Sequence, residues 1–313
     1  MDVVTIGETM VLFTPTTVGP LRYAAQFNKS IGGAESNVAI GLSRLGHQCG
    51  WISRLGLDEF GLYIRNFIRG EGVDTSLVNF DELHSTAVFF KERQMMQEPK
   101  ISYYRKNSAA SEMTPDDLNE EYIAKAKFLH VTGITPALSQ SCKETIDEAI
   151  SMAKKHGVMV VFDPNIRLKL WSPEEARVTL MNIAGKSDIV LPGLEEGLIL
   201  TGEIKPEAIA SQLLDCGAKI VVVKLGAGGA YYASKTETGL IPGFPVEQIV
   251  DPIGAGDAFA AGLLSGLLRG FALPEAVKLA NQVGAYALTV VGDMEGLPFW
   301  SQVDPNRKPE VNR

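Results

Sequence analysis

The sequence predicts a three-layer α/β fold with a mostly parallel central sheet and a small β-sheet lid. Short apolar segments rich in β-branched residues, such as 3–7, 158–165 and 219–226, are typical of strands buried on both faces. Helical patterns alternate with these segments, and such alternation predicts crossover connections and a parallel sheet. The stretch 85–108 instead alternates polar and apolar residues, which predicts an antiparallel hairpin with one wet face.

The individual elements follow from the same patterns. The predicted strands of the central sheet lie at 3–7, 128–133, 158–165, 188–193 and 219–226. The predicted helices between them lie at 34–46, 141–157 and 205–217, and two of these end in lysines or a glycine, as helix ends often do. A buried helix is predicted where the apolar run begins at Asp257, and another late helix at 279–288.

The chain is predicted to be a single domain, 1–313, because no repeat or low-complexity tract divides it. The predicted hairpin has a loop that contains Pro99. A hairpin inserted in a parallel α/β fold is typical of a lid or a dimer contact. We therefore expect lid segments around 10–30 and 85–108.

Composition limits the classes of partner. The chain has 29 basic and 37 acidic residues, a net charge of −8, which disfavours a general nucleic-acid binder but not an anionic small ligand. The three cysteines form no CxxC pair, so we expect neither disulfides nor a zinc site, and a reducing cytosol. The N-terminus shows no signal peptide and the chain no apolar run of membrane-spanning length, so we expect a cytoplasmic protein.

A glycine-rich segment ending in an acid, "DPIGAGDAFAAGLL" (251–264), carries the strongest functional signal. Gly254, Ala255 and Gly256 are small enough for the backbone to approach a ligand, and a helix N-terminus suits an anion. Asp257 is then either an N-cap or a general base beside the anion site. The segment is neither a Walker A loop nor a dinucleotide fingerprint, so any ATP would be bound in another way.

This segment resembles the C-terminal signature of the ribokinase-like (PfkB) carbohydrate kinases, usually DTxGAGD. The N-terminal signature of that family is similar to "IGGAESNVAIGLSRLG", followed by "RLGLDEFG" (54–61). Pro252 replaces the usual Thr, a departure expected to alter a cation site nearby. Within the family, the resemblance is greatest to kinases of 2-keto-3-deoxygluconate, on the segments "GPLRYAAQF", "YYRKNSAAS", "TGITPALS", "DPNIRLKLW" and "GDMEGLP".

The resemblance implies a role for each motif residue. Asp257 would be the base that activates the sugar hydroxyl, while the backbone N–H groups of Gly254, Ala255 and Gly256 would stabilise the charge on the γ-phosphoryl group. The residues that it places at the substrate, with Asp257, are Gly33, Ala34, Asn37, Phe89, Tyr103, Arg105, Arg167 and Asp293. We name residues 254–256 the glycine loop. The residues that the resemblance places at the nucleotide, together with this loop, are Asn165, Arg167, Lys224, Gly226, Ala227, Gly228, Gly229 and Asn281.

Chemistry supports several of these roles, and each residue also has a purely structural interpretation. A sugar acid needs a cation for its carboxylate, and the guanidinium group of Arg105 offers a planar fork. Asn37 offers a donor and an acceptor to hydroxyl groups, although segment 32–37 could be a plain helix start. The structural interpretation of Arg105 is a solvated surface position, and that of Phe89 and Tyr103 is packing within the hairpin. Arg167 could instead form an ion pair within its loop. The segment 226–229 could be a plain glycine turn, and Asp293 a turn residue.

Metal ligands cannot be assigned from the sequence. The family motif NxxE is reduced to "GLEE", so Gly193 lacks the amide while Glu196 keeps the acid. Magnesium prefers phosphate and water ligands, and the four histidines show no metal spacing. The resemblance implies ATP and Mg²⁺ as cofactors, with a monovalent cation such as K⁺ as a further candidate.

The function that the resemblance implies is transfer of the ATP γ-phosphoryl group to the 6-hydroxyl of 2-keto-3-deoxygluconate. Two competing functions stay open. The first is that of another kinase of the family, acting on fructose, ribose or a nucleoside; the second is that of a sugar-binding sensor without catalysis. The arginines at 105 and 167 argue against the first, and the intact Asp257 against the second. The resemblance also implies a homo-oligomer formed through the lid.

Overall fold

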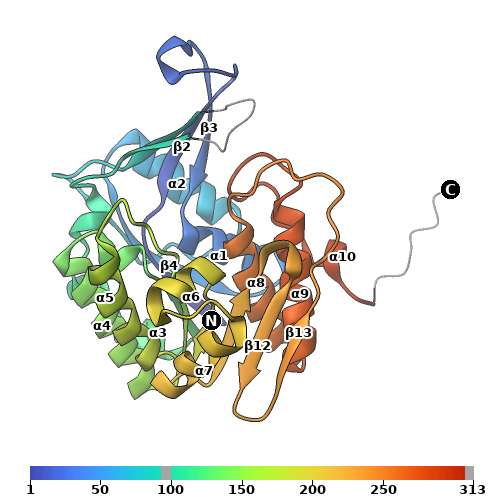
Figure 1. The fold of residues 1–313 in the computed structure, drawn as a ribbon. Coiled ribbons are helices and arrows are strands. Elements are labelled where there is room, and N and C mark those ends of the chain that lie inside the picture. The colour runs from blue at the N-terminus through green and yellow to red at the C-terminus, as the bar shows by residue number, and fades with distance from the viewer. Residues whose placement is uncertain (93–99, 307–313) are drawn as a thin grey trace.

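A nine-stranded sheet runs through the middle of the molecule, and a separate four-stranded sheet projects from one end of it (Figure 1). This computed structural model describes residues 1–92 and 100–306. The predicted α/β class with a mostly parallel sheet is confirmed. In spatial order, the strands of the large sheet are β13 (Thr238–Ile241), β12 (Ala230–Ser234), β11 (Ile220–Lys224), β10 (Ile189–Val190), β9 (Met159–Asp163), β8 (Phe128–Thr132), β1 (Val3–Ile6), β4 (Cys49–Gly56) and β5 (Val78–Asp81).

Helices cover both faces of this sheet and make the outer two layers (Figure 1). One face packs against α1 (Ala34–Arg44), α2 (Glu59–Gly70), α8 (Ala255–Leu268), α9 (Leu273–Ala287) and α10 (Trp300–Val303). The other packs against α3 (Glu120–Ala124), α4 (Gln140–Lys155), α5 (Pro173–Lys186), α6 (Leu194–Thr201) and α7 (Pro206–Cys216). None of the helices in the described residues combines the length and the hydrophobicity that crossing a lipid bilayer requires.

The apolar strands are explained by burial on both faces. In β11, Val221 and Val223 belong to the core under α3–α7, while Val222 belongs to the core under α8 and α9. Successive side chains of a strand point to opposite faces, so a sheet covered on both sides needs apolar residues at every position.

All five predicted central strands and all predicted helices are present, although the predicted strand 188–193 shortens to Ile189–Val190. The patterns above do not predict β4, β5, β12 and β13. Ser53 and Arg54 interrupt the apolar run of β4, and β5 is a short edge strand with the polar residues Asn79 and Asp81. Such strands lack the continuous apolar signature and are stabilised by their neighbours in the sheet.

We name the four-stranded sheet the lid. It has the order β3 (Phe27–Gly32), β2 (Met10–Pro15), β6 (Val88–Glu92) and β7 (Lys100–Tyr104). The predicted hairpin is confirmed as the antiparallel pair β6–β7, whereas β2 pairs in parallel with β6. The loop around Pro99 lies outside the described residues. The lid has its own small hydrophobic core of Met10, Leu12, Ala87 and Phe89, so it is a packed, ordered part of the fold.

Candidate active site

A pocket of about 380 Å³ lies between the lid and the carboxyl end of the central sheet. Ligands of open α/β sheets gather at this end because strand ends and helix N-termini converge there. The pocket is lined from three sides. Its lining includes Glu8 after β1, Asp163 at the end of β9 and Arg167 after it, Lys224 of β11, Gly33, Ala34 and Asn37 at the start of α1, Gly254, Gly256 and Asp257 at the start of α8, and Phe89, Tyr103 and Arg105 from the lid.

Asp257 lies at the third position of α8, in the first turn of the helix. The N-cap of α8 is Gly254, so the interpretation of Asp257 as the N-cap is wrong. Its carboxylate instead accepts a hydrogen bond of 2.8 Å from the side-chain amide of Asn37, which comes from α1. The first N–H groups of a helix have no partner within it, so the carboxylate lies beside ready donors for an anion.

The Asp257 carboxyl is poised to take a proton near neutral pH. Burial raises its pKa to about 7, the nearby charge of Asp163 acts in the same direction, and the hydrogen bond from Asn37 opposes both. Lys224 donates to Asp163 at 2.7 Å. Burial opposes the charge of Lys224, but Asp163 and Glu196 hold its pKa above the ordinary value, so it remains a cation. A base of pKa near 7 next to a fixed cation is the arrangement that a proton-abstracting phosphoryl transfer needs.

The lid supplies an aromatic and cationic wall. The rings of Phe89 and Tyr103 stack with centroids 5.6 Å apart, and the guanidinium of Arg105 lies 5.4 Å from the Tyr103 ring. Arg105 is only 9% exposed and forms an ion pair with Glu8, so a solvated surface position is wrong for it. The Nε atom of Arg105 is buried and has no hydrogen-bond partner among residues 1–92 and 100–306. Arg105 thus keeps one donor free of bonds to these residues while it lines the pocket.

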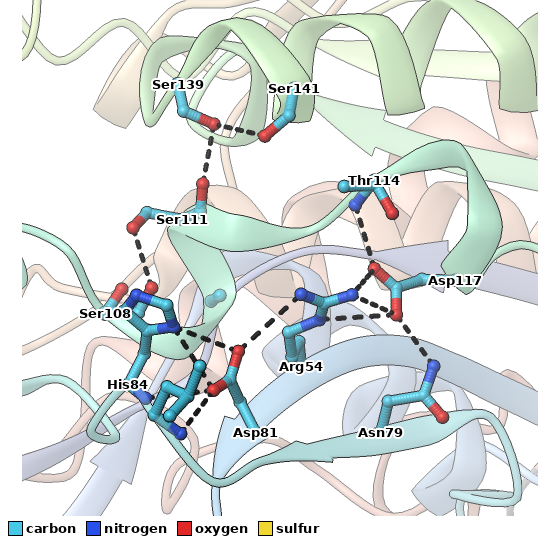
Figure 2. Close-up of polar contacts among 12 residues, drawn as sticks. Arg54, Asn79, Asp81, His84, Ser108, Ser111, Thr114, Asp117, Ser139 and Ser141 are labelled. Atoms are coloured by element: carbon cyan, nitrogen blue, oxygen red, sulfur yellow. Dashed lines mark hydrogen bonds and ion pairs between the residues drawn. The ribbon is translucent and has the colours of Figure 1, made fainter.

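A polar network behind the lid holds the segment that follows Arg105. Figure 2 shows Arg54 between Asp81 and Asp117, with a 2.9 Å ion pair to Asp117. Asp117 also accepts from the backbone of Thr114 and from Asn79, and so fixes the end of this segment. At its start, the hydroxyl of Ser108 donates to Glu8 at 2.6 Å. The segment that follows Arg105 is therefore fixed at both ends, and Glu8, the ion-pair partner of Arg105, is fixed by Ser108.

Asp293 lies in a bend after α9 and still faces the pocket. It is 7% exposed, and its Oδ1 atom has no hydrogen-bond partner in the part of the chain that the structure describes. Burial raises its pKa to about 7, the charge of Lys91 opposes this, and the charges of Glu295 and Asp251 add to it. The turn interpretation thus describes its backbone but not its side chain.

Among the described residues, those that line this pocket hold three buried polar atoms with neither a hydrogen bond nor an ion pair: Arg105 Nε, Asn37 Oδ1 and Asp293 Oδ1. A buried polar atom without a partner costs free energy, so such atoms are expected where a ligand supplies the missing bonds. One donor and two acceptors fit a small polyhydroxylated ligand that carries a carboxylate.

A second pocket of about 470 Å³ adjoins the first at Lys224, Pro252 and Gly256. It is larger and less polar than the first, and Phe244 and Pro245 are among the residues that line it. Gly226, Ala227, Gly229, Ala255 and Asn281, all predicted at the nucleotide, line it. The glycine loop at the start of α8 therefore separates a polar pocket from one that suits a flat, partly apolar ligand.

The backbone of the glycine loop has no room for side chains at Gly254. This residue has φ +81°, in the left-handed region, and a Cβ atom would lie 2.1 Å from the carbonyl oxygen of Asp293. Gly33 is tight for another reason, since a Cβ there would meet the backbone of Glu8 at 2.5 Å. Its glycine is thus explained by packing of α1 against the chain after β1.

Not every predicted residue lies where it was expected. Asn165, expected at the nucleotide, and Arg167, expected at both the substrate and the nucleotide, line the first pocket but not the second. Gly228 lies in the turn of 226–229 but is absent from the lining of both pockets. Arg167 forms no ion pair within the described residues, and its guanidinium donates to the Ile166 carbonyl at 3.3 Å. The described residues therefore give no support to the interpretation of Arg167 as part of a loop ion pair.

The sequence reasoning missed Glu8 and Asp163, which line the first pocket, and Asp251. Asp163 is the last residue of the buried strand β9 and Glu8 lies two residues after the end of β1, and these positions at strand carboxyl ends could have indicated them. Asp251 opens the glycine-rich segment itself. All three are nearly fully buried, which for carboxylates requires compensating partners.

The described residues offer few ligands for magnesium at this site. Within residues 1–92 and 100–306, no three His, Cys, Asp or Glu side chains are grouped to hold a metal ion. Both carboxylate oxygens of Glu196 accept backbone N–H groups, of Ile166 and of Gly193. Asp163 and Glu196 nevertheless face the pocket. These residues fit an ion that keeps phosphate and water ligands and meets the protein through water.

Comparison with known proteins agrees with this geometry. The model of the pfkB family of carbohydrate kinases matches residues 1–300. The 2-dehydro-3-deoxygluconokinase of Bacillus subtilis (strain 168) is 41% identical over 300 residues, which cover 95% of this chain and 93% of that protein. Fructokinase-1 of Zea mays is 36% identical over 311 residues, with 96% of both chains covered.

Solved structures share the whole fold. A protein from E. coli named ribokinase II, in complex with ATP and Mg²⁺, has a TM-score of 0.90 at 30% identity, covering 96% of this chain and 97% of that one. A double mutant of fructokinase from Vibrio cholerae, with fructose, ADP and a potassium ion bound, has a TM-score of 0.84 at 32% identity, covering 95% and 96%.

Proposed function

Since this chain belongs to the pfkB family of carbohydrate kinases, we propose that it transfers the γ-phosphoryl group of ATP to the 6-hydroxyl of 2-keto-3-deoxygluconate. The observation that carries the proposal is the pair of adjoining pockets that meet at the glycine loop, where Gly256 lines both pockets and the next residue, Asp257, lines the first. The polar pocket takes the sugar acid, and the less polar one takes the nucleotide.

The reaction forms a bond between the sugar oxygen and the γ-phosphorus and breaks the bond from that phosphorus to the bridging oxygen of ADP. Asp257 accepts the proton of the sugar hydroxyl as the new bond forms. The N–H groups at the start of α8 donate to the oxygens of the transferring group. Lys224, held by Asp163 at 2.7 Å, lies where it can pair with phosphate. Bound Mg²⁺ would neutralise the phosphate charge, with Asp163 and Glu196 on the protein side.

Arg105 and Arg167 support a sugar acid rather than a neutral sugar. Both line the sugar pocket, and Arg105 has one free buried donor. A carboxylate beside these two guanidinium groups gains charge-assisted hydrogen bonds that a neutral hydroxyl cannot make. The similarity to 2-dehydro-3-deoxygluconokinase supports the same class of substrate.

Fructokinase activity is the competing function, because a fructokinase is also similar over the whole chain. A coupled assay of ADP release tests both, over a panel of keto-deoxy sugar acids, fructose, ribose and nucleosides. We expect the highest kcat/KM on 2-keto-3-deoxygluconate. A higher kcat/KM on fructose would refute the proposed substrate, and no ADP release on any sugar would support a sensor.

We expect Arg105→Ala to raise KM for the keto-deoxy acid about 10- to 150-fold, the loss of one charge-assisted hydrogen bond. Arg167→Ala should act in the same direction. Arg105→Lys is the matched control, since it keeps the charge beside Glu8 but loses the fork, and its KM should fall between those of the wild type and Arg105→Ala. Steady-state kinetics on the acid and on fructose check this. Equal losses on both substrates would contradict a carboxylate role.

Asp293→Ala should lower kcat/KM on the preferred acid by about 10-fold or more, in line with one hydrogen bond to a charged group. The reason is that its unpartnered Oδ1 atom accepts a sugar hydroxyl, which also orients the 6-hydroxyl toward Asp257. Asp293→Asn keeps an acceptor and should lose less. The preference between gluconate- and galactonate-derived acids is measured alongside, and an unchanged preference and efficiency in Asp293→Ala would contradict the role.

Two further features are proposed from the resemblance. We place the enzyme in the cytoplasm, which the free thiols of Cys49, Cys142 and Cys216 support.

We also expect a homo-oligomer formed through the lid. The outer face of the lid carries the packed rings of Phe13, Phe27 and Phe90 with Tyr104, which is 66% exposed. Such an aromatic face suits an interface.

A further inference from the structure

A buried ion pair connects the lid to the glycine loop. Lys91 of β6 and Asp251, which precedes α8, form it, and their side chains are each only 4% exposed. The Oδ1 atom of Asp251 accepts the N–H of Ile253 at 3.2 Å, and its Oδ2 atom accepts the N–H of Gly292 at 3.1 Å. One carboxylate thus gathers three segments: the lid, the glycine loop and the bend that carries Asp293.

The charge of Asp251 needs a cation, because an isolated buried carboxylate is strongly disfavoured. The sequence resemblance implied a monovalent cation near Pro252, the neighbour of Asp251, and one structural relative has a potassium ion bound. Potassium in proteins is held by oxygen atoms that replace its hydration shell. In this chain the ammonium group of Lys91 already occupies the carboxylate of Asp251. A second cation on that carboxylate would be repelled by the first, so these residues do not fit potassium.

We propose that the ammonium group of Lys91 takes the place of a bound monovalent cation beside Asp251, so that the enzyme needs no added potassium. The activity part of this inference rests on the proposed kinase function. Lys91 is a positioning residue, because it acts on the reaction through Asp251. Its positive charge stabilises the carboxylate of Asp251, which accepts the backbone N–H of Ile253. The next residue, Gly254, is the N-cap of α8.

The wild-type enzyme gives the first test. Kinase activity is measured in potassium chloride and in choline chloride at equal ionic strength, after potassium has been removed by dialysis. We expect kcat in choline within about two-fold of kcat in potassium, since no interaction of the transition state changes. A kcat in choline below about a tenth of the potassium value would overturn the proposal.

The variants give the second test. Lys91→Ala leaves a space beside Asp251 and removes the charge, and we expect kcat in choline to fall about 10- to 100-fold through misplacement of the loop. Potassium or ethylammonium chloride should restore much of this loss. Lys91→Met also removes the charge but fills the space, so the same salts should restore little. Lys100→Ala, which removes an exposed lysine from the next lid strand, should behave as the wild type in every salt. A Lys91→Ala enzyme with unchanged kcat in choline would overturn the proposal.

Thermal unfolding gives a readout that needs no substrate. The Tm of the wild type should not rise with potassium relative to choline, whereas the Tm of Lys91→Ala should rise with potassium concentration because a bound cation stabilises the folded state. A potassium-dependent Tm in the wild type would overturn the inference even if the kinase function holds. If no sugar is phosphorylated, the Tm series still decides it. If Lys91→Ala fails to fold, the wild-type series decides it alone.

Discussion

Asp257→Asn is expected to lower kcat by about 10²- to 10⁴-fold while nucleotide binding persists, since the amide cannot accept the proton of the sugar hydroxyl. The amide keeps the size of the side chain and can still bond with Asn37. Turnover is measured in the coupled assay, and ATP binding by calorimetry. Glu175→Gln is the matched control, because Glu175 also lies at the third position of its helix, α5, but away from both pockets. A turnover within a few fold of the wild type would contradict the role of Asp257 as base.

The pKa of Asp257 adds a pH dependence to this result. A general base works only when deprotonated, and the pKa of Asp257 is raised to about 7, so kcat/KM should fall as the pH is lowered through about 7. The stability of the folded state depends on pH in the opposite direction. A carboxyl whose pKa is raised in the folded state contributes stability at low pH and loses it as the pH rises through about 7. The Tm of Asp257→Asn at pH 8 should therefore equal or exceed that of the wild type.

Gly254→Ala is expected to lower kcat by on the order of 10²-fold, because the added methyl group displaces the first turn of α8. A Cβ atom at this position would lie 2.1 Å from the backbone oxygen of Asp293, so the loop and the bend that carries Asp293 must move apart. The left-handed φ of +81° adds a cost of about 1–2 kcal/mol to folding.

Gly270→Ala separates these two effects. Gly270 also has a left-handed φ, +77°, but nothing lies within 4 Å of the Cβ position, so it shares the backbone cost without the collision. We expect a similar fall in Tm for both variants but a loss of turnover only for Gly254→Ala. Equal kcat values in the two variants would show that the glycine loop tolerates displacement.

Much of the sheet could be predicted because its strands are buried on both faces, and this leaves a continuous apolar signature. The strand β4 could not, since Ser53 and Arg54 break that signature and Arg54 is used by the network behind the lid. Asp257 could be found because glycines, acid and helix lie together in one segment. The partner of Arg105 could not, because Glu8 reaches it only through the register of strands in the folded lid. The same holds for Lys91, which is 160 residues from Asp251.

The parallel pairing of β2 with β6 has a consequence for how the protein is made. Leu12 pairs with Phe89, so the lid stays incomplete during synthesis until the segments that form α1, β4, α2 and β5 have followed β3. Until then the hairpin of β2 and β3 exposes Leu12 and Phe13 without their partners, which is the kind of edge that aggregates. The lid is also not a contiguous piece of chain. Exchanging the lid between relatives therefore requires two grafts rather than one: the segment of β2 and β3, and the segment of β6 and β7. The two grafted segments must also match each other where β2 pairs with β6.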